Sequence, residues 1–334
     1  MREGRLVCLG VESTAHTLGI GVVDSSGRVL ANEMATYRPT DSGIHPREAA
    51  QHHAQVAQEV LRRALERSVS SAEEIDVVAF ASGPGLGPCL RTGATLARAI
   101  ALKLGRPLVA VNHGVAHIEI GKLSTGFRDP VVLYVAGGNT LVTTLSEGRY
   151  RVLGETLDIA AGNCLDAFGI EAGIGPMPAP EVWASRGQRY VPMPIRVKGM
   201  DVSFSGALTR ALALLREGVR VEDVALSLTE AVYSMLTEVL ERAVAMTGKK
   251  EVMVVGGLAR SRRLSEMVTE MVKLHGAEFR QIPDDLLGDN GAMIAWTGLL
   301  MYRSGQTVTV EESRVRPKFR IDEVEVTWEG RSGS

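Results

Sequence analysis

Residues 6–23 read LVCLGVESTAHTLGIGVV, two apolar runs joined by a short polar loop. The runs 6–11 and 18–23 have the length and the Val, Leu and Ile content of buried strands. The turn sequence DSSG at 24–27 leads into a third strand at 28–33. The start of the chain is therefore expected to form a three-stranded meander.

A second copy of this pattern occurs later in the chain. Residues 130–135 and 141–145 read as strands on either side of the polar loop GGNT, and a turn at 146–148 precedes a third strand. Helical segments then alternate with strands, so each half is expected to read βββαβαβα. Strands joined through helices pair in parallel by right-handed crossovers. The predicted fold class is a duplicated α/β fold, two lobes with a cleft between them.

The domain boundaries follow from this repeat. We expect an N-terminal lobe at 1–128, a C-terminal lobe at 129–305 and a C-terminal tail at 306–334. The segment near 176–215 fits neither copy of the repeat and reads as an insertion. Polar and apolar residues alternate at 320–328, which predicts an edge strand in the tail.

Composition and charge restrict the class of protein. The chain has 334 residues, enough for two domains with a large core, and a formal net charge of −2. This charge argues against a protein that grips nucleic acid alone through a broad basic face, but not against a nucleic acid presented by partners. The three separated cysteines predict neither a disulfide framework nor a zinc ribbon. No signal-peptide pattern and no apolar run of roughly 18 residues is found, so the expected location is cytoplasmic, without a membrane partner.

A pair of histidines stands where a strand is expected to end and a helix to begin. His113 and His117 are four residues apart, so both imidazoles lie on one helical face and can point at one ion. Asp289, at the start of the last long helix, is the best third ligand, because it occupies the second lobe's counterpart of the His113 position. Capping or core roles are the alternatives for all three residues. Gly114 stands where H-E-x-x-H has glutamate, which argues against a metalloprotease.

Two glycine loops are candidates for contact with a phosphate. GPGLGP at 83–88 and GGNT at 137–140 could each let the backbone approach a ligand, although structural turns are the alternative. Neither is a Walker A loop, since no Gly-Lys-Ser/Thr follows. Asp158 and Asp166 border a stretch of small residues, and one of them could bind a ribose or an amide. Solvated helix carboxylates are the alternative for these two.

In combination, the motifs resemble a known family. The chain is similar, over roughly residues 6 to 305, to the archaeal and eukaryotic-type tRNA N6-adenosine threonylcarbamoyltransferases, the catalytic subunits of the KEOPS complex. This family has the fold of actin, Hsp70 chaperones and sugar kinases. The stretches that carry the resemblance are GVESTAHT at 10–17, GIHPRE at 43–48, GPGLGPCLR at 83–91, VNHGVAHIE at 111–119, YVAGGNT at 134–140, ETLDIAAGN at 155–163, SFSG at 203–206 and DNGAMIA at 289–295.

The resemblance implies an activity and a set of site residues. The family transfers a threonylcarbamoyl group from threonylcarbamoyl-adenylate to N6 of the adenosine beside the anticodon, in tRNAs that read ANN codons. It implies one divalent metal per subunit, iron in preference to zinc, and ATP or threonylcarbamoyl-adenylate as the nucleotide. The implied partners are a kinase or ATPase subunit, small accessory subunits and tRNA. No residue is identified as the general base. The implied metal ligands are His113, His117, Tyr134 and Asp289, and the implied nucleotide or substrate contacts are Tyr134, Val135, Ala136, Gly137, Gly138 and Asp166.

Three positions depart from the family pattern. Ala179 replaces a glycine, Trp183 replaces a glutamate and Ser261 replaces an asparagine, all at expected nucleoside contacts. These changes keep open a scaffold protein without catalysis. A phosphotransferase or ATPase of the same fold is the other alternative, although those kinases typically have aspartate in the first hairpin loop, where this chain has Glu12 and Ser13.

Overall fold

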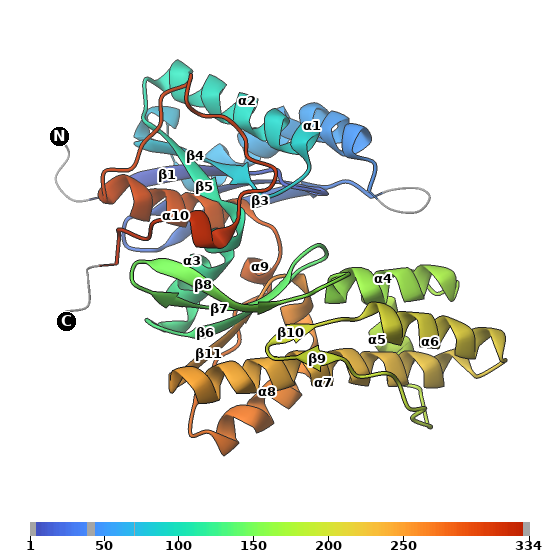
Figure 1. Cartoon of the computed structure of the whole chain (residues 1–334). Helices are drawn as coiled ribbons and strands as arrows, with labels where there is room; N and C mark the ends of the chain where they lie inside the picture. Colours follow the sequence, from blue (N-terminus) through green and yellow to red (C-terminus); the bar gives the residue numbers. More distant parts are fainter. Residues whose placement is uncertain (1–4, 39–43, 70, 330–334) are drawn as a thin grey trace. The chain divides into compact units, whose positions relative to one another are not determined.

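The computed structural model describes residues 5–38, 44–69 and 71–329, and it divides into two compact units (Figure 1). The described part therefore leaves out Gly43 of one family motif and both ends of the chain. Unit 1 consists of Met1–Gly126, Ser146–Tyr150 and Gly288–Ser334, and unit 2 consists of Phe127–Leu145 and Arg151–Leu287. This grouping differs from the boundaries expected from the sequence, because the last long helix packs in unit 1.

The sheet of unit 1 contains the first meander. Its strand order is β3-β2-β1-β4-β5. The β1–β2 and β2–β3 pairs are antiparallel, whereas β4 pairs in parallel with both β1 and β5. The strands β1 and β2 are buried along their whole length, as their apolar runs predict. The bounds are β1 (Val7–Glu12), β2 (Thr17–Asp24), β3 (Val29–Thr36), β4 (Val77–Gly83) and β5 (Leu108–Asn112).

Helices cover both faces of this sheet. The helices α1 (Pro46–Ser68) and α2 (Gly87–Leu104) pack together on one face, and the short helix η1 (Ala72–Glu74) precedes β4. The helices α3 (His113–Thr125) and α10 (Gly291–Arg303) pack against each other, and α10 contacts β1, β2 and β4 (Figure 1). This arrangement brings the start of α10 close to the first hairpin of the chain.

Unit 2 repeats the same sheet. Its order is β12-β11-β6-β7-β8, which matches unit 1 strand for strand, with β6 antiparallel to β7 and parallel to β11. The duplicated α/β fold predicted from the sequence is confirmed. The bounds are β6 (Val131–Val135), β7 (Thr140–Ser146), β8 (Arg149–Glu155), β11 (Glu251–Val255) and β12 (Glu278–Phe279).

The helices of unit 2 surround the long helix α7. This helix spans Val221–Thr247 and contacts α4, α5, α6, α8 and β6. The segment read as an insertion supplies α5, the small β9–β10 hairpin and most of α6. The bounds are α4 (Ala161–Glu171), α5 (Ala179–Ala184), β9 (Val197–Lys198), β10 (Asp201–Val202), α6 (Ser205–Arg216), η2 (Gly257–Arg260), α8 (Arg262–Leu274) and α9 (Asp284–Leu287).

The C-terminal segment packs along unit 1 without forming the expected edge strand. Val308 makes one antiparallel bridge to Leu108, and Ile321–Glu323 forms the short helix η3. Within the described part of the chain, residues 320–328 contain no strand, so that prediction is wrong. Ile321, Val324 and Val326 are buried, and their apolar side chains anchor the segment instead.

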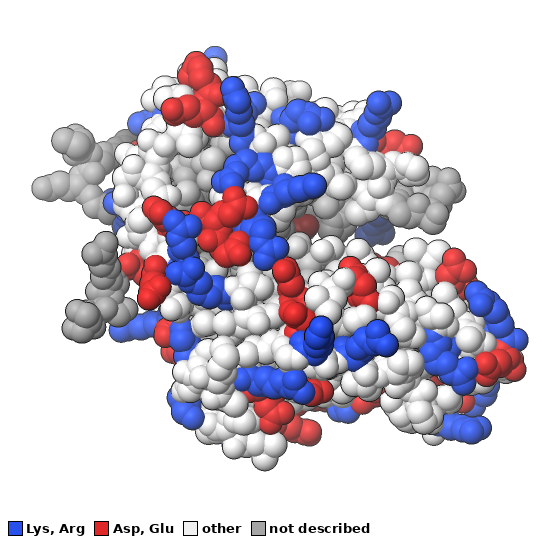
Figure 2. Space-filling model, viewed as in Figure 1, with Lys and Arg blue, Asp and Glu red and all other residues white. Residues whose placement is uncertain are grey.

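The charged side chains are mixed on the surface. On the face shown in Figure 2, Lys and Arg lie among Asp and Glu, and the described residues of that face form no large field of one sign. This distribution agrees with the near-zero net charge. Among the described residues, no helix combines the length and the apolar character needed to cross a membrane.

Candidate metal centre

The two histidines lie on the first turns of α3. β5 ends at Asn112, whose side-chain oxygen caps the helix by accepting a hydrogen bond from the Val115 amide at 3.1 Å. His113 and His117 follow on one face, with ring centroids 4.7 Å apart and ring planes at 88°. Both side chains are buried, so a rigid strand-to-helix junction holds the imidazoles in place.

Asp289 completes a cluster of three possible ligands. One of its oxygens, Oδ1, lies 3.5 Å from His113 Nε2 and 3.3 Å from His117 Nε2. The next residue, Asn290, caps α10 by accepting a hydrogen bond from the Met293 amide at 3.0 Å. A ligand atom from each of the three residues lies within 4.8 Å of the other two.

Asp289 lies in a different unit from the one that the sequence repeat predicts. The sequence repeat placed Asp289 in the second lobe, facing His113 across a cleft. In the structure Gly288–Ser334 belongs to unit 1, so the aspartate and both histidines lie in the same unit. The close packing of α10 on the first hairpin is responsible, since α10 contacts both β1 and β2.

Glu12 is a functional candidate that the sequence reading did not select. It ends β1, its side chain is 0% exposed, and Oε2 accepts a hydrogen bond from His113 Nδ1 at 2.9 Å. Its other oxygen, Oε1, accepts from the Thr14 amide at 2.7 Å and from the Thr14 hydroxyl. The signal available in the sequence was a single carboxylate directly after a buried strand.

His16 is a second residue that the sequence reading did not select. Its Nδ1 lies 3.8 Å from Asp289 Oδ2, and its side chain is 46% exposed. It lies in the loop between β1, which ends at Glu12, and β2. The end of β1 therefore supplies one buried carboxylate behind His113, and the loop supplies one half-exposed imidazole beside Asp289.

Burial and neighbouring charges together shift the pKa values of His113, His117 and Asp289. Burial alone would lower the pKa of His113, but the charges of Glu12 and Asp289 and the hydrogen bond to Glu12 raise it to about 9. For His117, burial dominates and lowers the pKa. Burial would raise the pKa of Asp289, yet the neighbouring histidines hold it well below the usual range. The aspartate is therefore ionised at neutral pH.

These residues fit a divalent ion. Two imidazole nitrogens and one carboxylate oxygen converge, which is the ligand set of many zinc enzymes and non-haem iron enzymes. Three protein ligands leave coordination positions for a substrate. Tyr134 is the last but one residue of β6 and is buried, but it belongs to unit 2, so its role as a fourth ligand stays a prediction.

The loop of the predicted nucleotide contacts follows β6. Val135 is buried, Ala136 is half-buried, and Gly137 and Gly138 are exposed. The Ala136 amide donates to the Asn139 carbonyl at 2.9 Å, and the Asn163 amide donates to the Gly137 carbonyl at 3.2 Å. The exposed glycine backbone thus lies beside the first turn of α4, a favourable place for an anion.

The two aspartates singled out in the sequence, Asp158 and Asp166, both make structural hydrogen bonds within unit 2. Asp166 Oδ1 accepts from the Met177 amide at 2.7 Å, which ties α4 to the segment before α5. Asp158 accepts from the Phe204 amide at 2.9 Å and the Ser205 amide at 3.1 Å, at the start of α6. Asp158 is therefore the cap of α6, and substrate contact by Asp166 stays a prediction.

The three departures from the family pattern lie in unit 2. Ala179 begins α5, and Trp183 on the same helix lies 5.6 Å from the guanidinium of Arg186. Ser261 is buried and caps α8, because its hydroxyl oxygen accepts from the Leu264 amide at 3.1 Å. Serine is among the strongest helix caps, so this departure has a local structural use.

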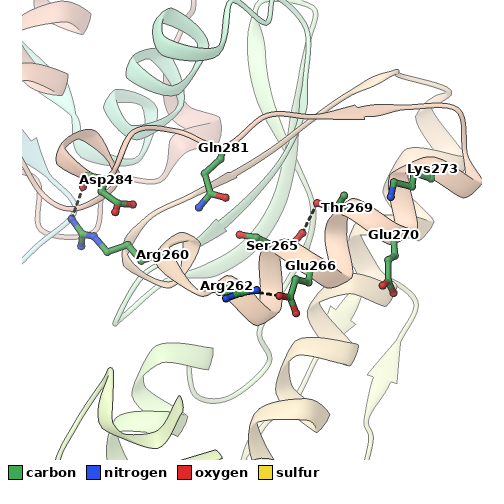
Figure 3. Close-up of a pocket in the computed structure, with 9 residues that line it drawn as sticks. All are labelled: Arg260, Arg262, Ser265, Glu266, Thr269, Glu270, Lys273, Gln281 and Asp284. Carbon is green, nitrogen blue, oxygen red and sulfur yellow. Dashed lines mark hydrogen bonds and ion pairs between the residues drawn. The ribbon is translucent and has the colours of Figure 1, made fainter. Parts of the chain in front are cut away.

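A polar pocket in unit 2 contains none of the predicted site residues (Figure 3). Arg260 donates to the Asp284 carbonyl at 2.9 Å, and Arg262 pairs with Glu266 at 2.9 Å. Two of its arginines are thus engaged by neighbouring lining residues. The lining residues are Arg260, Arg262, Ser265, Glu266, Thr269, Glu270, Lys273, Gln281 and Asp284.

Solved structures with the same fold define the class of this protein. HypF from T. kodakarensis is 17% identical, with a TM-score of 0.64, over 90% of this chain and 48% of that chain. An activator of the 2-hydroxyisocaproyl-CoA dehydratase from Clostridium difficile is 13% identical, with a TM-score of 0.53, over 90% and 97% of the two chains. The chain is a duplicated α/β protein of the actin, Hsp70 and sugar-kinase fold class, with a candidate metal centre in unit 1.

Sequence relatives narrow the class to one family. The family model described as tRNA N6-adenosine threonylcarbamoyltransferase matches residues 28–296. A protein of that name from Thermofilum pendens is 56% identical over 98% of both chains. A probable bifunctional tRNA threonylcarbamoyladenosine biosynthesis protein from Methanocaldococcus jannaschii is 49% identical over 97% of this chain and 60% of its own length. The chain belongs to the tRNA N6-adenosine threonylcarbamoyltransferase family and is a transferase of tRNA modification, which confirms the resemblance read from the sequence.

Proposed function

We propose that this chain transfers a threonylcarbamoyl group from threonylcarbamoyl-adenylate to N6 of the adenosine beside the anticodon in tRNAs that read ANN codons. Membership of the family supports the transfer. The observation that carries the proposal is the convergence of His113, His117 and Asp289 in unit 1. These three residues would hold one divalent ion, and the family resemblance favours iron over zinc.

The ion would supply Lewis-acid chemistry by polarising the phosphate or carbonyl of the acyl-adenylate. The chain's own residues orient the reactants. The backbone amides of the exposed residues Gly137 and Gly138 would stabilise negative charge on the leaving group. The adenosine amine would attack the carbamoyl carbon, the bond from that carbon to the phosphate oxygen would break so that AMP leaves, and the amine would release one proton to solvent. A neutral aromatic amine is a weak nucleophile, so positioning must supply much of the rate.

The nucleotide contacts are part of the proposal. Tyr134 to Gly138 would contact the phosphates or the acyl group, and Asp166 would contact the substrate. Ala179, Trp183 and Ser261 would alter the nucleoside end of the site, and Trp183 could stack on a base where a glutamate would bind ribose hydroxyls. Trp183→Glu is expected to tighten binding of a non-hydrolysable ATP analogue, as measured by calorimetry. Unchanged affinity would mean that the tryptophan has taken over the contact.

We further propose that the chain acts with partners as part of KEOPS, in the cytoplasm. A kinase or ATPase subunit and small accessory subunits would present the tRNA. One observation supports a partner: the Methanocaldococcus jannaschii relative is named bifunctional and is longer than this chain. In that relative a second function shares one polypeptide with the matched part. In this protein the second function would belong to a separate partner subunit.

The test combines metal analysis with tRNA modification. The chain would be purified without oxygen or an affinity tag and incubated with partners, threonylcarbamoyl-adenylate and unmodified tRNA. Mass spectrometry of the tRNA nucleosides is expected to show the modified adenosine, and elemental analysis about one metal per chain. His113→Ala is expected to lose the metal and to lower transfer at least about 100-fold, because a ligand is removed.

The control is Glu119→Gln, a buried carboxylate on α3 that accepts a hydrogen bond from the Tyr150 hydroxyl at 2.7 Å and takes no part in the cluster. It is expected to keep metal and activity. Full metal content in His113→Ala would overturn the assignment of His113 as a metal ligand. Absence of modified adenosine with the unaltered chain would favour the scaffold alternative, and phosphorylation of a sugar without bound metal would favour the kinase alternative.

A further inference from the structure

We propose that Glu12 is a positioning residue whose buried carboxylate fixes the ring of His113 with Nε2 directed at the metal position. This inference rests on the proposed function, because it assigns a role toward the ion that His113, His117 and Asp289 would hold. The cluster of three possible ligands does not include Glu12.

The two nitrogens of His113 face opposite partners. Nδ1 lies 2.9 Å from Glu12 Oε2, and Nε2 lies 3.5 Å from Asp289 Oδ1. A carboxylate can only accept hydrogen bonds, so Nδ1 must carry the proton in this contact. When an ion displaces the other ring proton, the lone pair that it meets is therefore on Nε2, on the same side as His117 Nε2 and Asp289.

The carboxylate itself is held in place. Glu12 is fully buried at the end of β1, and its Oε1 accepts both the amide and the hydroxyl hydrogen of Thr14. The backbone of β1 is fixed in turn by pairing with β2 and β4 on its two sides. One oxygen of Glu12 is therefore anchored by the loop, and the other is committed to the imidazole.

A purely structural role explains the contacts of only one of the two Glu12 carboxylate oxygens. Thr14 alone would satisfy one oxygen, whereas a fully buried second oxygen without a donor would be costly. The donor that satisfies it is a ring nitrogen of a candidate metal ligand. Carboxylates in this position fix the tautomer and orientation of metal-bound histidines, and their loss typically costs about 10–100-fold in metal affinity.

Metal titration of the apo-protein tests the proposal without relying on activity. The chain stripped of metal would be titrated with Zn²⁺ and Co²⁺ in competition with a chelator of known affinity. Glu12→Gln is expected to raise the Kd about 10–100-fold while the stoichiometry stays near one. The Co²⁺ absorption spectrum is expected to change as well, because the ring of His113 is held less firmly.

Two control variants separate positioning from stability. Glu119→Gln removes another buried carboxyl charge on α3 and is expected to leave the Kd unchanged. Thr14→Val removes the hydroxyl contact to Oε1 and leaves the His113 contact in place, so a change of at most about threefold is expected. A Kd in Glu12→Gln within about threefold of the unaltered chain, with the same thermal midpoint, would overturn the proposal.

A measurement on the unaltered chain keeps the proposal testable if Glu12→Gln does not fold. Nitrogen-15 NMR of the Zn²⁺-bound protein is expected to show His113 protonated at Nδ1 and coordinated through Nε2. Coordination through Nδ1 would overturn the role of Glu12 and leave the metal site standing. Absence of metal binding by the unaltered chain would overturn both the metal site and this inference.

Discussion

At the scale of single residues, glycine decides how closely α10 approaches the first hairpin. A Cβ atom on Gly21 would lie 2.1 Å from the Ala292 backbone nitrogen and 2.3 Å from the Gly291 carbonyl carbon. The backbone of β2 meets the backbone of α10 here, so there is no flexible side chain that could move aside. This contact places the start of α10, and with it Asp289, next to β2.

Gly21→Ala is expected to lower the free energy of unfolding by about 1–3 kcal/mol, or more, because overpacking forces the backbone of α10 to shift. Metal affinity is expected to fall with it, since Asp289 directly precedes α10. Denaturant unfolding and metal titration measure the two effects. Gly206→Ala is the control. Gly206 lies in α6, and the nearest atom that an added Cβ would meet is Pro194 Cβ, at the ordinary contact distance of 3.9 Å. A loss in Gly206→Ala as large as in Gly21→Ala would contradict this packing argument.

The sequence predicted these residues to different extents. His113 and His117 were found because four-residue spacing on a helix is a local pattern. Asp289 was found by pattern but placed in the wrong unit, since the glycine packing that brings α10 to β2 is a long-range contact. Glu12 was not selected, because nothing local connects it with a histidine far along the chain.

At the scale of secondary-structure elements, long internal segments were predicted well and sheet edges poorly. The sequence pattern predicts a helix at 221–247 and a strand at 251–255, and these segments coincide with α7 and β11. The pattern also predicts a strand at 277–282, which is too long, because β12 pairs with β11 only at Glu278 and Phe279. An edge strand has one neighbour, so its length depends on that neighbour and cannot be read from its own sequence pattern.

The cap of α6 gives a prediction at this scale. Asp158 accepts hydrogen bonds from the amides of Phe204 and Ser205 and from the hydroxyls of Ser203 and Ser205. Burial raises the pKa of Asp158, but these hydrogen bonds outweigh it and hold the pKa well below the usual range. Since the folded pKa is depressed, this stabilisation is present above the unfolded pKa, about 3.9, and is lost as the pH falls below it.

Asp158→Asn is therefore expected to lower the free energy of unfolding by about 1–2 kcal/mol at pH 7. The difference from the unaltered chain is expected to shrink at pH 3, where the carboxylate begins to be protonated in the unfolded state. Urea unfolding at the two pH values measures this. A difference that is the same at pH 7 and pH 3 would show that the charge of Asp158 contributes nothing.

At the scale of the whole molecule, the C-terminal segment holds unit 1 together across distant parts of the chain. The Arg316 amide donates to the Ser82 carbonyl at 2.6 Å, and the Gly85 amide donates to the Pro317 carbonyl at 3.1 Å. The side-chain amide of Asn112 donates to the Phe319 carbonyl at 3.0 Å. The segment thus contacts the GPGLGP loop and the residue directly before α3, the helix that carries the two candidate histidine ligands. Sequence patterns could not predict this, because irregular segments have no periodicity.

Asn112→Asp tests whether this attachment stabilises the unit. Aspartate caps a helix as well as asparagine does, so α3 keeps its cap, but the donor to the C-terminal segment is lost and a carboxylate faces two carbonyls. We expect a loss of about 1–3 kcal/mol in the free energy of unfolding and faster hydrogen exchange at the amides of Arg316 and Phe319. The control is Gln306→Ala, which removes a hydrogen bond to Thr327 at 2.7 Å from the exposed part of the same segment, with an expected effect below about 0.5 kcal/mol. Unchanged exchange at Arg316 in Asn112→Asp would mean that the segment is held by its buried residues Ile321 and Val324 alone.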